Sequence, residues 1–220
     1  MHFTASVLAA AAMATLANAH GYFVSPKARV PGTAFQTACG MQAYYQLSGD
    51  INGNIQGLQQ TTSGQSDYNP AQCNLWKCKG LKYADNTANV YKYTAGQTVA
   101  MNFDIRAPHT GYANVSIIDL STPHGTVIAA NLKKWDVYAS TATTIPDSEE
   151  NFSIKMPSNL GKKCAAKGAC AIQMHWDAPA PVSQTYQSCI DFTMAAPASK
   201  RDEDRLHGRD FSPRLGGEEA

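Results

Sequence analysis

The sequence lacks net charge of either sign. Its 18 Lys and Arg residues nearly balance 17 Asp and Glu residues, which leaves a formal charge of +1. After residue 19 it also lacks any segment close to the roughly 20 apolar residues that span a bilayer. It ends without the hydrophobic stretch that directs a GPI anchor. Nothing in the chain therefore indicates binding to nucleic acid or insertion into a membrane.

The first 19 residues have the form of a secretory signal peptide. A short start without Lys or Arg precedes an apolar stretch of small residues, and Ala17-Asn18-Ala19 fits the small-residue rule for cleavage. We predict that residues 1–19 are removed and that the protein is secreted to the extracellular space. His20 would then be its first residue.

The rest of the chain divides into one domain and a tail. About 200 residues follow the leader, which suits one folded domain with its own core, placed here at residues 20–197. Residues 198–220 carry mixed charge without an apolar period, so we expect a disordered tail. Lys200-Arg201 at this boundary is either a dibasic processing site or a pair of ordinary solvated charges.

Alternation of apolar and polar residues indicates strands in the second half of the chain. The apolar members are Val99/Met101/Phe103/Ile105, Val115/Ile117, Phe152/Ile154/Met156, Ile172/Met174/Trp176 and Ile190/Phe192/Met194. Short strands without intervening helical periods predict an all-β fold, an immunoglobulin or fibronectin III-like antiparallel β-sandwich. Residues 20–83, rich in Gly, Gln, Asn and Ser, are predicted to form a long N-terminal loop region.

Six cysteines follow the leader, and an even number in an oxidising compartment favours three disulfides over a thiolate metal site. Two pairs are close in sequence and are predicted as local bridges, and the remaining two cysteines then tie the N-terminal region to the last strand. The predicted bridges are Cys73–Cys78, Cys164–Cys170 and Cys39–Cys189. Asn114 and Asn151 begin Asn-x-Ser sequons and are candidate glycosylation sites.

His20 is a candidate metal ligand because of its predicted place at the start of the mature chain. A first-residue histidine offers its α-amino group and its ring together, so that one residue can chelate a metal. The unperturbed pKa values of these groups, about 8 and about 6.5, allow both to lose their protons near neutral pH. Copper(II) suits such nitrogen ligation and heads the affinity order of the divalent first-row metals. A histidine that simply follows the cleavage site is the alternative.

His109 is the best candidate for a second ligand. His207 lies in the predicted tail, and His124 follows Pro123 in a predicted turn. His109 lies between two predicted strands, and loops at the end of a sandwich expose functional side chains. Alone it would be interpreted as a solvated loop residue, but with an N-terminal histidine in the same chain a metal ligand becomes the better interpretation.

Three motifs together resemble the lytic polysaccharide monooxygenases, and among them the chitin-binding type-4 domain group. They are His20-Gly-Tyr after the leader, Ala-Pro-His109-Thr-Gly-Tyr, and Gln184-Thr-Tyr186-Gln-Ser-Cys189-Ile-Asp. The resemblance covers residues 20–194, and it rests on the order and spacing of motifs that are weak singly. It implies a copper enzyme that cleaves glycosidic bonds oxidatively in crystalline polysaccharide, chitin or cellulose, by hydroxylation at C1 or C4.

The resemblance also implies a role for each residue. In that family an N-terminal histidine and a second histidine hold one copper ion in a histidine brace, and His20 and His109 match these positions. Tyr186 matches the axial residue, and Gln184 a glutamine that orients the oxidant. Cys189 matches a disulfide cysteine of the cellulose-active branch. The implied partners are a polysaccharide surface and an external electron donor, and we expect a monomer.

Other interpretations remain open at this point. A non-catalytic copper-binding or chitin-binding secreted protein could use the same brace, although Gln184 beside Tyr186 favours an enzyme. A glycoside hydrolase would need paired carboxylates, and the strand pattern brings none together. His175 is either a proton donor near the metal or an ordinary strand histidine. Aromatic residues that could stack on sugar rings or pack beneath the long loop are Tyr22, Tyr44, Tyr45, Tyr68, Trp76 and Tyr112.

Overall fold

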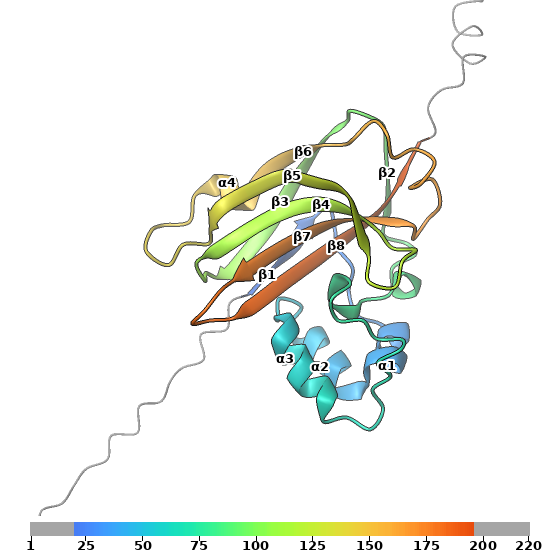
Figure 1. The fold of residues 1–220 in the computed structure, drawn as a ribbon, viewed down its shortest axis with the longest axis vertical. Coiled ribbons are helices and arrows are strands. Elements are labelled where there is room, and N and C mark those ends of the chain that lie inside the picture. Colours follow the sequence, from blue (N-terminus) through green and yellow to red (C-terminus); the bar gives the residue numbers. More distant parts are fainter. Residues whose placement is uncertain (1–19, 196–220) are drawn as a thin grey trace, which may run out of the picture.

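The computed structural model describes residues 20–195, so the predicted leader and the whole predicted tail, with Lys200, Arg201 and His207, lie outside the described residues. Two sheets form a sandwich, and a group of helices lies on one side of it, next to β8 (Figure 1). No helix in the described part of the chain is both long and apolar enough to cross a membrane.

The sandwich consists of a sheet of three strands and a sheet of five. The smaller sheet has the order β1-β3-β6, with bounds His20–Ser25, Thr98–Ala107 and Asn151–Lys155. The larger has the order β2-β8-β7-β4-β5, with bounds Val90–Tyr93, Gln184–Met194, Cys170–Ala178, Gly111–Asp119 and Thr126–Tyr138. All pairs are antiparallel except β2 with β8. The predicted sandwich is confirmed, and the predicted alternating segments lie on β3, β4, β6, β7 and β8.

Strand β5 forms one edge of the larger sheet. Its pairing with β4 shifts register in three places, which bends a strand of 13 residues. Val127 and Val137 are 51% and 61% exposed on this strand. Charged side chains lie between them, with Lys133 over the ring of Trp135.

The inner faces of the two sheets enclose the main core. Along β7, Ile172, Met174 and Trp176 are fully buried between the sheets, as the period of two predicts. The outward residues of β7 and β8 are also largely buried, because the segment between β1 and β2 covers that face. The larger sheet is thus covered on both sides along these two strands.

The predicted loop region of residues 20–83 is wrong in its main part, because this segment contains three α-helices. They are α1 (Thr33–Cys39), α2 (Met41–Gly49) and α3 (Ile55–Ser63), followed by two short 3-10 helices, η1 (Cys78–Gly80) and η2 (Tyr83–Asp85), while α4 (Asp147–Glu150) precedes β6. Ile55, Leu58 and Thr62 form one buried face of α3, with helical spacing. Its abundant Gln is a good helix former, which the composition argument did not consider.

Side-chain caps satisfy backbone N–H groups in the first turns of α1 and α3. The Asp85 carboxylate accepts hydrogen bonds at 2.8 Å from the backbone N–H groups of Ala34 and Phe35, and so caps the first turn of α1 from about 50 residues away. Asn54 caps α3 locally by accepting from Gly57 at 2.7 Å. Only the second of these signals is local in sequence.

Two of the three predicted disulfides are wrong. Cys164–Cys170 is confirmed, but Cys73 pairs with Cys39 rather than Cys78. Cys78 pairs with Cys189, so the predicted Cys39–Cys189 bridge is absent. Cys73 and Cys78 lie in different layers although they are close in sequence. Cys73 belongs to the core of the helical region, and Cys78 packs on the outer face of β8.

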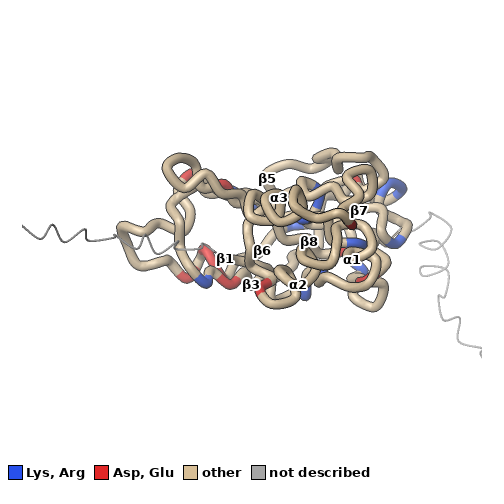
Figure 2. Tube along the Cα trace, turned by 90° about the horizontal axis from the view of Figure 1, so that it is seen from below, with Lys and Arg blue, Asp and Glu red and all other residues tan. Residues whose placement is uncertain are grey.

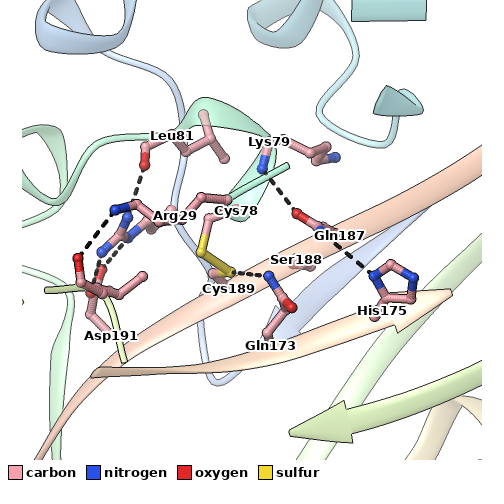
Figure 3. Close-up of a disulfide and its surroundings, with 12 residues drawn as sticks. Arg29, Cys78, Lys79, Leu81, Gln173, His175, Gln187, Ser188, Cys189 and Asp191 are labelled. Carbon is pink, nitrogen blue, oxygen red and sulfur yellow. Dashed lines mark hydrogen bonds and ion pairs between the residues drawn. A yellow bond between two sulfur atoms is a disulfide. The ribbon is translucent and has the colours of Figure 1, made fainter. Parts of the chain in front are cut away.

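A buried ion pair lies beside the Cys78–Cys189 bridge (Figure 3). The Arg29 guanidinium donates to both carboxylate oxygens of Asp191, at 2.7 and 2.6 Å, and to the carbonyl of Leu81 at 2.8 Å. Both charged side chains are almost fully buried. This bidentate geometry joins the segment after β1, strand β8 and the loop beyond η1.

Lys79, the residue after Cys78, is also buried. It adopts a positive φ of 54° and donates through Nζ to the carbonyls of Ile51 and Gly53, at 2.5 and 3.2 Å. Burial lowers the pKa of its ammonium to about 7, with the charge of Asp50 opposing this shift. Its backbone N–H points toward Gln187 (Figure 3).

Removing Cys78–Cys189 should destabilise the protein most. In the chain-entropy model this loop, with a sequence separation of 111, contributes about 5 kcal/mol, against about 2.5 kcal/mol for Cys164–Cys170 with its separation of 6. Chemical unfolding of the two double Cys→Ala variants checks this order. A larger loss for the Cys164 and Cys170 variant would contradict this order, and a peptide joining Cys39 to Cys189 in a non-reduced digest would contradict the pairing.

Lys79 should make stability depend on pH. Its folded pKa of about 7 lies below the unfolded value of 10.5, so between these values the unfolded state binds more protons and stability rises with pH. Relative to Lys79→Met, the wild-type free energy of unfolding should rise by up to about 1.4 kcal/mol per pH unit from pH 7.5 to pH 9. Parallel denaturant-derived curves for the two proteins would show that Lys79 titrates normally.

Candidate functional site

The candidate site lies at the end of the sandwich where β1 and β8 begin and β3 meets β4 (Figure 1). His20 pairs with Ala107 at the end of β3, and His109 lies two residues further, in the short connection to β4. The fold therefore brings the backbone of the predicted first residue close to the predicted second ligand. The side chain of His20 lies outside what the structure describes.

The start of β1 is held tightly against β3. The register shifts between His20 and Gly21, a bulge that re-aims the first residue relative to the ladder. A Cβ at Gly21 would lie 2.5 Å from a ring carbon of Phe103 and 3.1 Å from the carbonyl oxygen of Asp104. Only glycine allows this approach, which explains the residue after His20 in physical terms.

Strand β1 is also tied to β8 across the sandwich. The backbone N–H of Phe23 donates to Ser188 Oγ at 3.1 Å. Ser188 lies two residues beyond Tyr186, and Phe23 lies three beyond His20. The starts of the two strands are thus fixed relative to each other by a buried hydrogen bond.

His109 presents an unsatisfied ring nitrogen. Its Nδ1 atom is buried and has no hydrogen-bond partner, while the residue as a whole is partly exposed. A buried polar atom without a partner costs about 1 to 3 kcal/mol, and such atoms in native folds call for an explanation. A ligand that binds His109 would supply one.

Gly111 fixes the loop that carries His109. A Cβ at Gly111 would lie 2.0 Å from the carbonyl oxygen of Asp177 on β7, a backbone atom that has no room to move. The close approach of β4 and β7 at this end therefore depends on glycine. It sets the path of the chain two residues after His109.

Gln184 and Tyr186 are brought together as a pair. Tyr186 is fully buried on the inner face of β8, where its ring packs against Trp176 with centroids 4.5 Å apart. Its hydroxyl donates to Gln184 Oε1. Burial raises the pKa of Tyr186 well above its usual value, so the phenol keeps its proton at neutral pH.

A row of polar residues on the outer face of the same strands was not found from the sequence. Tyr112, Asp177 and Thr185 are neighbours across β4, β7 and β8, and Thr185 Oγ1 donates to Asp177 at 2.9 Å. A hydrogen bond to Asp177 raises the pKa of Tyr112. Gln56 Oε1 of α3 accepts from the Thr185 backbone N–H at 2.8 Å, and the Gln56 amide donates to Thr185 Oγ1 at 3.1 Å. The one sequence feature that could have indicated this row is the alternation of side chains along a strand, which places Thr185 on the face opposite Gln184 and Tyr186.

His175 lies on the outer face of β7, opposite the inner face that carries Trp176. The Gln187 amide donates to its Nδ1 at 3.4 Å (Figure 3), and burial lowers its pKa against the opposing charge of Asp177. These are the surroundings of an ordinary strand histidine. The His175 side chain lies on the opposite face of the sheet from Tyr186. His124 lies in the β4–β5 turn, at the far end of β4 from His109.

The candidate glycosylation residues differ in exposure. Asn151 is exposed at the start of β6, where it accepts from Asn102 and donates to Asp147, both at 2.7 Å. Asn114 is half-buried on β4 in the interior of the larger sheet and accepts from Ser116 at 2.9 Å.

Within the described residues no group of three His, Cys, Asp or Glu side chains could hold a metal by itself. The side chain of His20 is not among these residues, and its ring, with its α-amino group once the leader is removed, would add donors beside His109.

Comparison with known proteins places the chain in a family. Residues 20–192 match the family model described as lytic polysaccharide mono-oxygenase, cellulose-degrading. A search of curated proteins gives no match.

Similar solved structures share little sequence identity with the chain. A Bacillus amyloliquefaciens protein solved in complex with Cu(I) is 16% identical, with 80% of this chain and 100% of that chain covered and a TM-score of 0.41. A Streptomyces lividans lytic polysaccharide monooxygenase is 16% identical, with coverage of 79% and 99% and a TM-score of 0.39. Entomopoxvirus fusolin is 13% identical, with coverage of 91% and 83% and a TM-score of 0.43.

The family match extends over most of the chain, from the first residue of β1 to within two residues of the end of β8. It includes His20, His109, Gln184 and Tyr186. The chain belongs to the lytic polysaccharide mono-oxygenase family.

Proposed function

We propose that the protein is a secreted, copper-dependent mono-oxygenase that cleaves glycosidic bonds in a crystalline polysaccharide. The observation that carries this proposal is the unpartnered Nδ1 of His109 at the end of the sandwich where β1 begins. In this proposal one copper ion per chain is held by His109 and by the amino group and ring of His20.

The donor set suits copper. Two imidazoles and a primary amine are nitrogen donors that can all be neutral near pH 7. Copper(II) binds such ligands more tightly than the other divalent first-row metals do. The chelate at His20 requires a free amino group, and therefore removal of residues 1–19. When bound, the metal would supply one-electron redox chemistry with O₂ or H₂O₂ and an external electron donor.

Tyr186 and Gln184 would shape the space beside the metal. Tyr186 stays a neutral phenol and excludes water from the inner side of the site, since it is fully buried against Trp176. Gln184 Oε1 is occupied by the Tyr186 hydroxyl, which leaves its amide N–H groups to donate. The pair would thus position a hydrogen-bond acceptor such as an oxidant. A protein that only carries copper has no need of such a donor.

The substrate would bind on the outer surface around this end. Tyr112 is 46% exposed three residues after His109, and its hydroxyl is held by Asp177. An aromatic ring fixed in this way can stack on a sugar ring without losing much conformational freedom. We propose cellulose or chitin as the polymer and C1 or C4 as the oxidised carbon, and the products decide between them.

Copper titration of the protein that begins at His20 is the first test. We expect tight binding of one ion, loss of at least about 100-fold in affinity in His109→Ala because one of three nitrogen donors is missing, and no loss in His124→Ala. A form that retains Ala19 should also bind weakly, since its chelate is blocked.

The same proteins should be compared on chitin and on cellulose with ascorbate and peroxide. Oxidised oligosaccharides from the wild type and His124→Ala, but not from His109→Ala, would support the enzyme. Tight copper binding without products on either polymer would instead support a carrier or an adhesion protein. Equal copper affinity in wild type and His109→Ala would contradict the proposed ligands.

Gly111→Ala should weaken copper binding although it removes no donor. The added Cβ would meet the Asp177 carbonyl, so β4 must separate from β7 and carry His109 with it. We expect a loss of about 1 to 3 kcal/mol in stability and a lower copper affinity.

Gly49→Ala is the matched control, because nothing lies within 4 Å of a Cβ there. Urea unfolding and copper titration should leave this variant close to wild type. If Gly111→Ala behaves in the same way, the position of His109 does not depend on this close contact.

A further inference from the structure

A pocket of about 720 Å³ lies at the opposite end of the sandwich. It opens between the β4–β5 turn, Gly168 before β7 and the segment from Tyr68 to Tyr83. Strand β4 runs from the His109 loop to this pocket, so the two sites are separated by the length of the sheet. The volume is within the range of pockets that bind small ligands.

The charge of this pocket is of one sign. Lys77, Lys82, Arg29 and His124 line it, and among the described residues no Asp or Glu does. Arg29 is already paired with Asp191, whereas the ammonium groups of Lys77 and Lys82 donate only to backbone carbonyls, those of Leu120, Thr122 and Gln72. Lys and Arg positions gather at this end of the molecule, near α1 (Figure 2).

The nearest carboxylates are engaged elsewhere. Asp119 accepts from Ser121 at 2.6 Å and pairs with Lys163 at 3.2 Å. Asp85 caps helix α1. Neither carboxylate forms an ion pair with a pocket lysine, although the charge of Asp119 acts on Lys77 and that of Asp85 acts on Lys82.

The pKa values of both lysines are lowered, mainly by burial. The charge of Arg29 adds to this shift at Lys77, and the charge of Asp119 opposes it. The charges of Lys77 and Arg29 add to it at Lys82, and the charge of Asp85 opposes it. A bound anion would relieve the repulsion among these groups.

Aromatic rings form the other part of the lining. Trp76 is 46% exposed and lies in the wall together with Tyr68 and Tyr83. Aromatic faces beside cations suit a ligand that has a flat apolar ring face as well as a negative charge. A simple inorganic anion would contact only the cationic side chains and not the aromatic rings.

The wall that carries Trp76 and Lys77 is rigid. It lies between Cys73 and Cys78, each of which forms a disulfide with a different layer. The Gln187 amide donates to the Trp76 carbonyl at 3.2 Å, and Asn74 donates to the Pro123 carbonyl at 2.9 Å. A wall fixed in this way loses little freedom when a ligand binds.

We propose that this pocket binds an acidic sugar unit of a glycan, with its carboxylate between Lys77 and Lys82 and its ring against Trp76. The near-neutral charge of the whole chain argues against an extended polyanion such as nucleic acid, and a concave pocket with two ammonium groups that have only carbonyl acceptors suits a single carboxylate. The site is independent of the metal and would hold a mixed polysaccharide while the other end works on it.

Binding of trigalacturonate to the complete secreted protein tests the proposal, with cellotriose as the neutral probe and inorganic phosphate as the probe with charge alone. Titration calorimetry should show binding of trigalacturonate, no binding of cellotriose, and much weaker binding of phosphate. The affinity for trigalacturonate should fall at about 0.5 M NaCl, because salt screens exposed charges.

Three variants and one control locate the ligand. Lys77→Gln with Lys82→Gln, Lys82→Gln alone, and Trp76→Ala should each lower the affinity at least about fivefold, and Lys92→Gln, an exposed lysine on β2, should not. The single variants serve if the double variant does not fold. Copper affinity should be unchanged in all of them, so this result is independent of the proposed mono-oxygenase activity.

Two outcomes would overturn the proposal. Absence of trigalacturonate binding at millimolar concentration would show that the pocket is not a ligand site. Equal binding of phosphate, with no effect of Trp76→Ala, would show a site for simple anions and no contact with a sugar ring.

Discussion

The buried ion pair between Arg29 and Asp191 joins the parts on which both sites depend. Arg29 follows β1 and Asp191 lies on the outer face of β8, while the third guanidinium bond reaches the loop beyond η1. Loss of one partner would leave an uncompensated buried charge, at a cost of about 3 to 5 kcal/mol. Because β1 begins at His20 and β8 at Gln184, this bridge anchors the two strands that carry the proposed metal site and one wall of the basic pocket.

What the sequence predicts correctly depends on short-range pattern. The period of two along Ile172, Met174 and Trp176 reflects one face packed in the core, so the sandwich follows from it. The pairing of Gln184 with Tyr186 follows in the same way, since residues two apart on a strand share a face. The position of His109 in a loop between two consecutive strands is equally local, although β3 and β4 belong to different sheets and not to neighbouring positions of one sheet.

What it does not predict depends on contacts between distant segments. The pairing of Cys73 with Cys39 and not with nearby Cys78 is decided by which layer each cysteine enters, and sequence separation gives no information on that. The cap on α1 comes from Asp85, and the support of Thr185 comes from Gln56, more than 100 residues away. The polar composition of this region did not indicate α1 to α3, because Gln and Asn occur both in loops and on the exposed faces or at the caps of helices.

The edge of the larger sheet bears on how the protein behaves at high local concentration. A long unpaired edge strand is a template on which a second chain can add its own strand. Strand β5 presents such an edge, but its three register shifts and the charged groups of Lys133, Lys134 and Asp136 oppose a regular ladder with another copy. If the protein works on a solid polysaccharide as proposed, this edge would therefore give neighbouring molecules little means of joining into a continuous sheet.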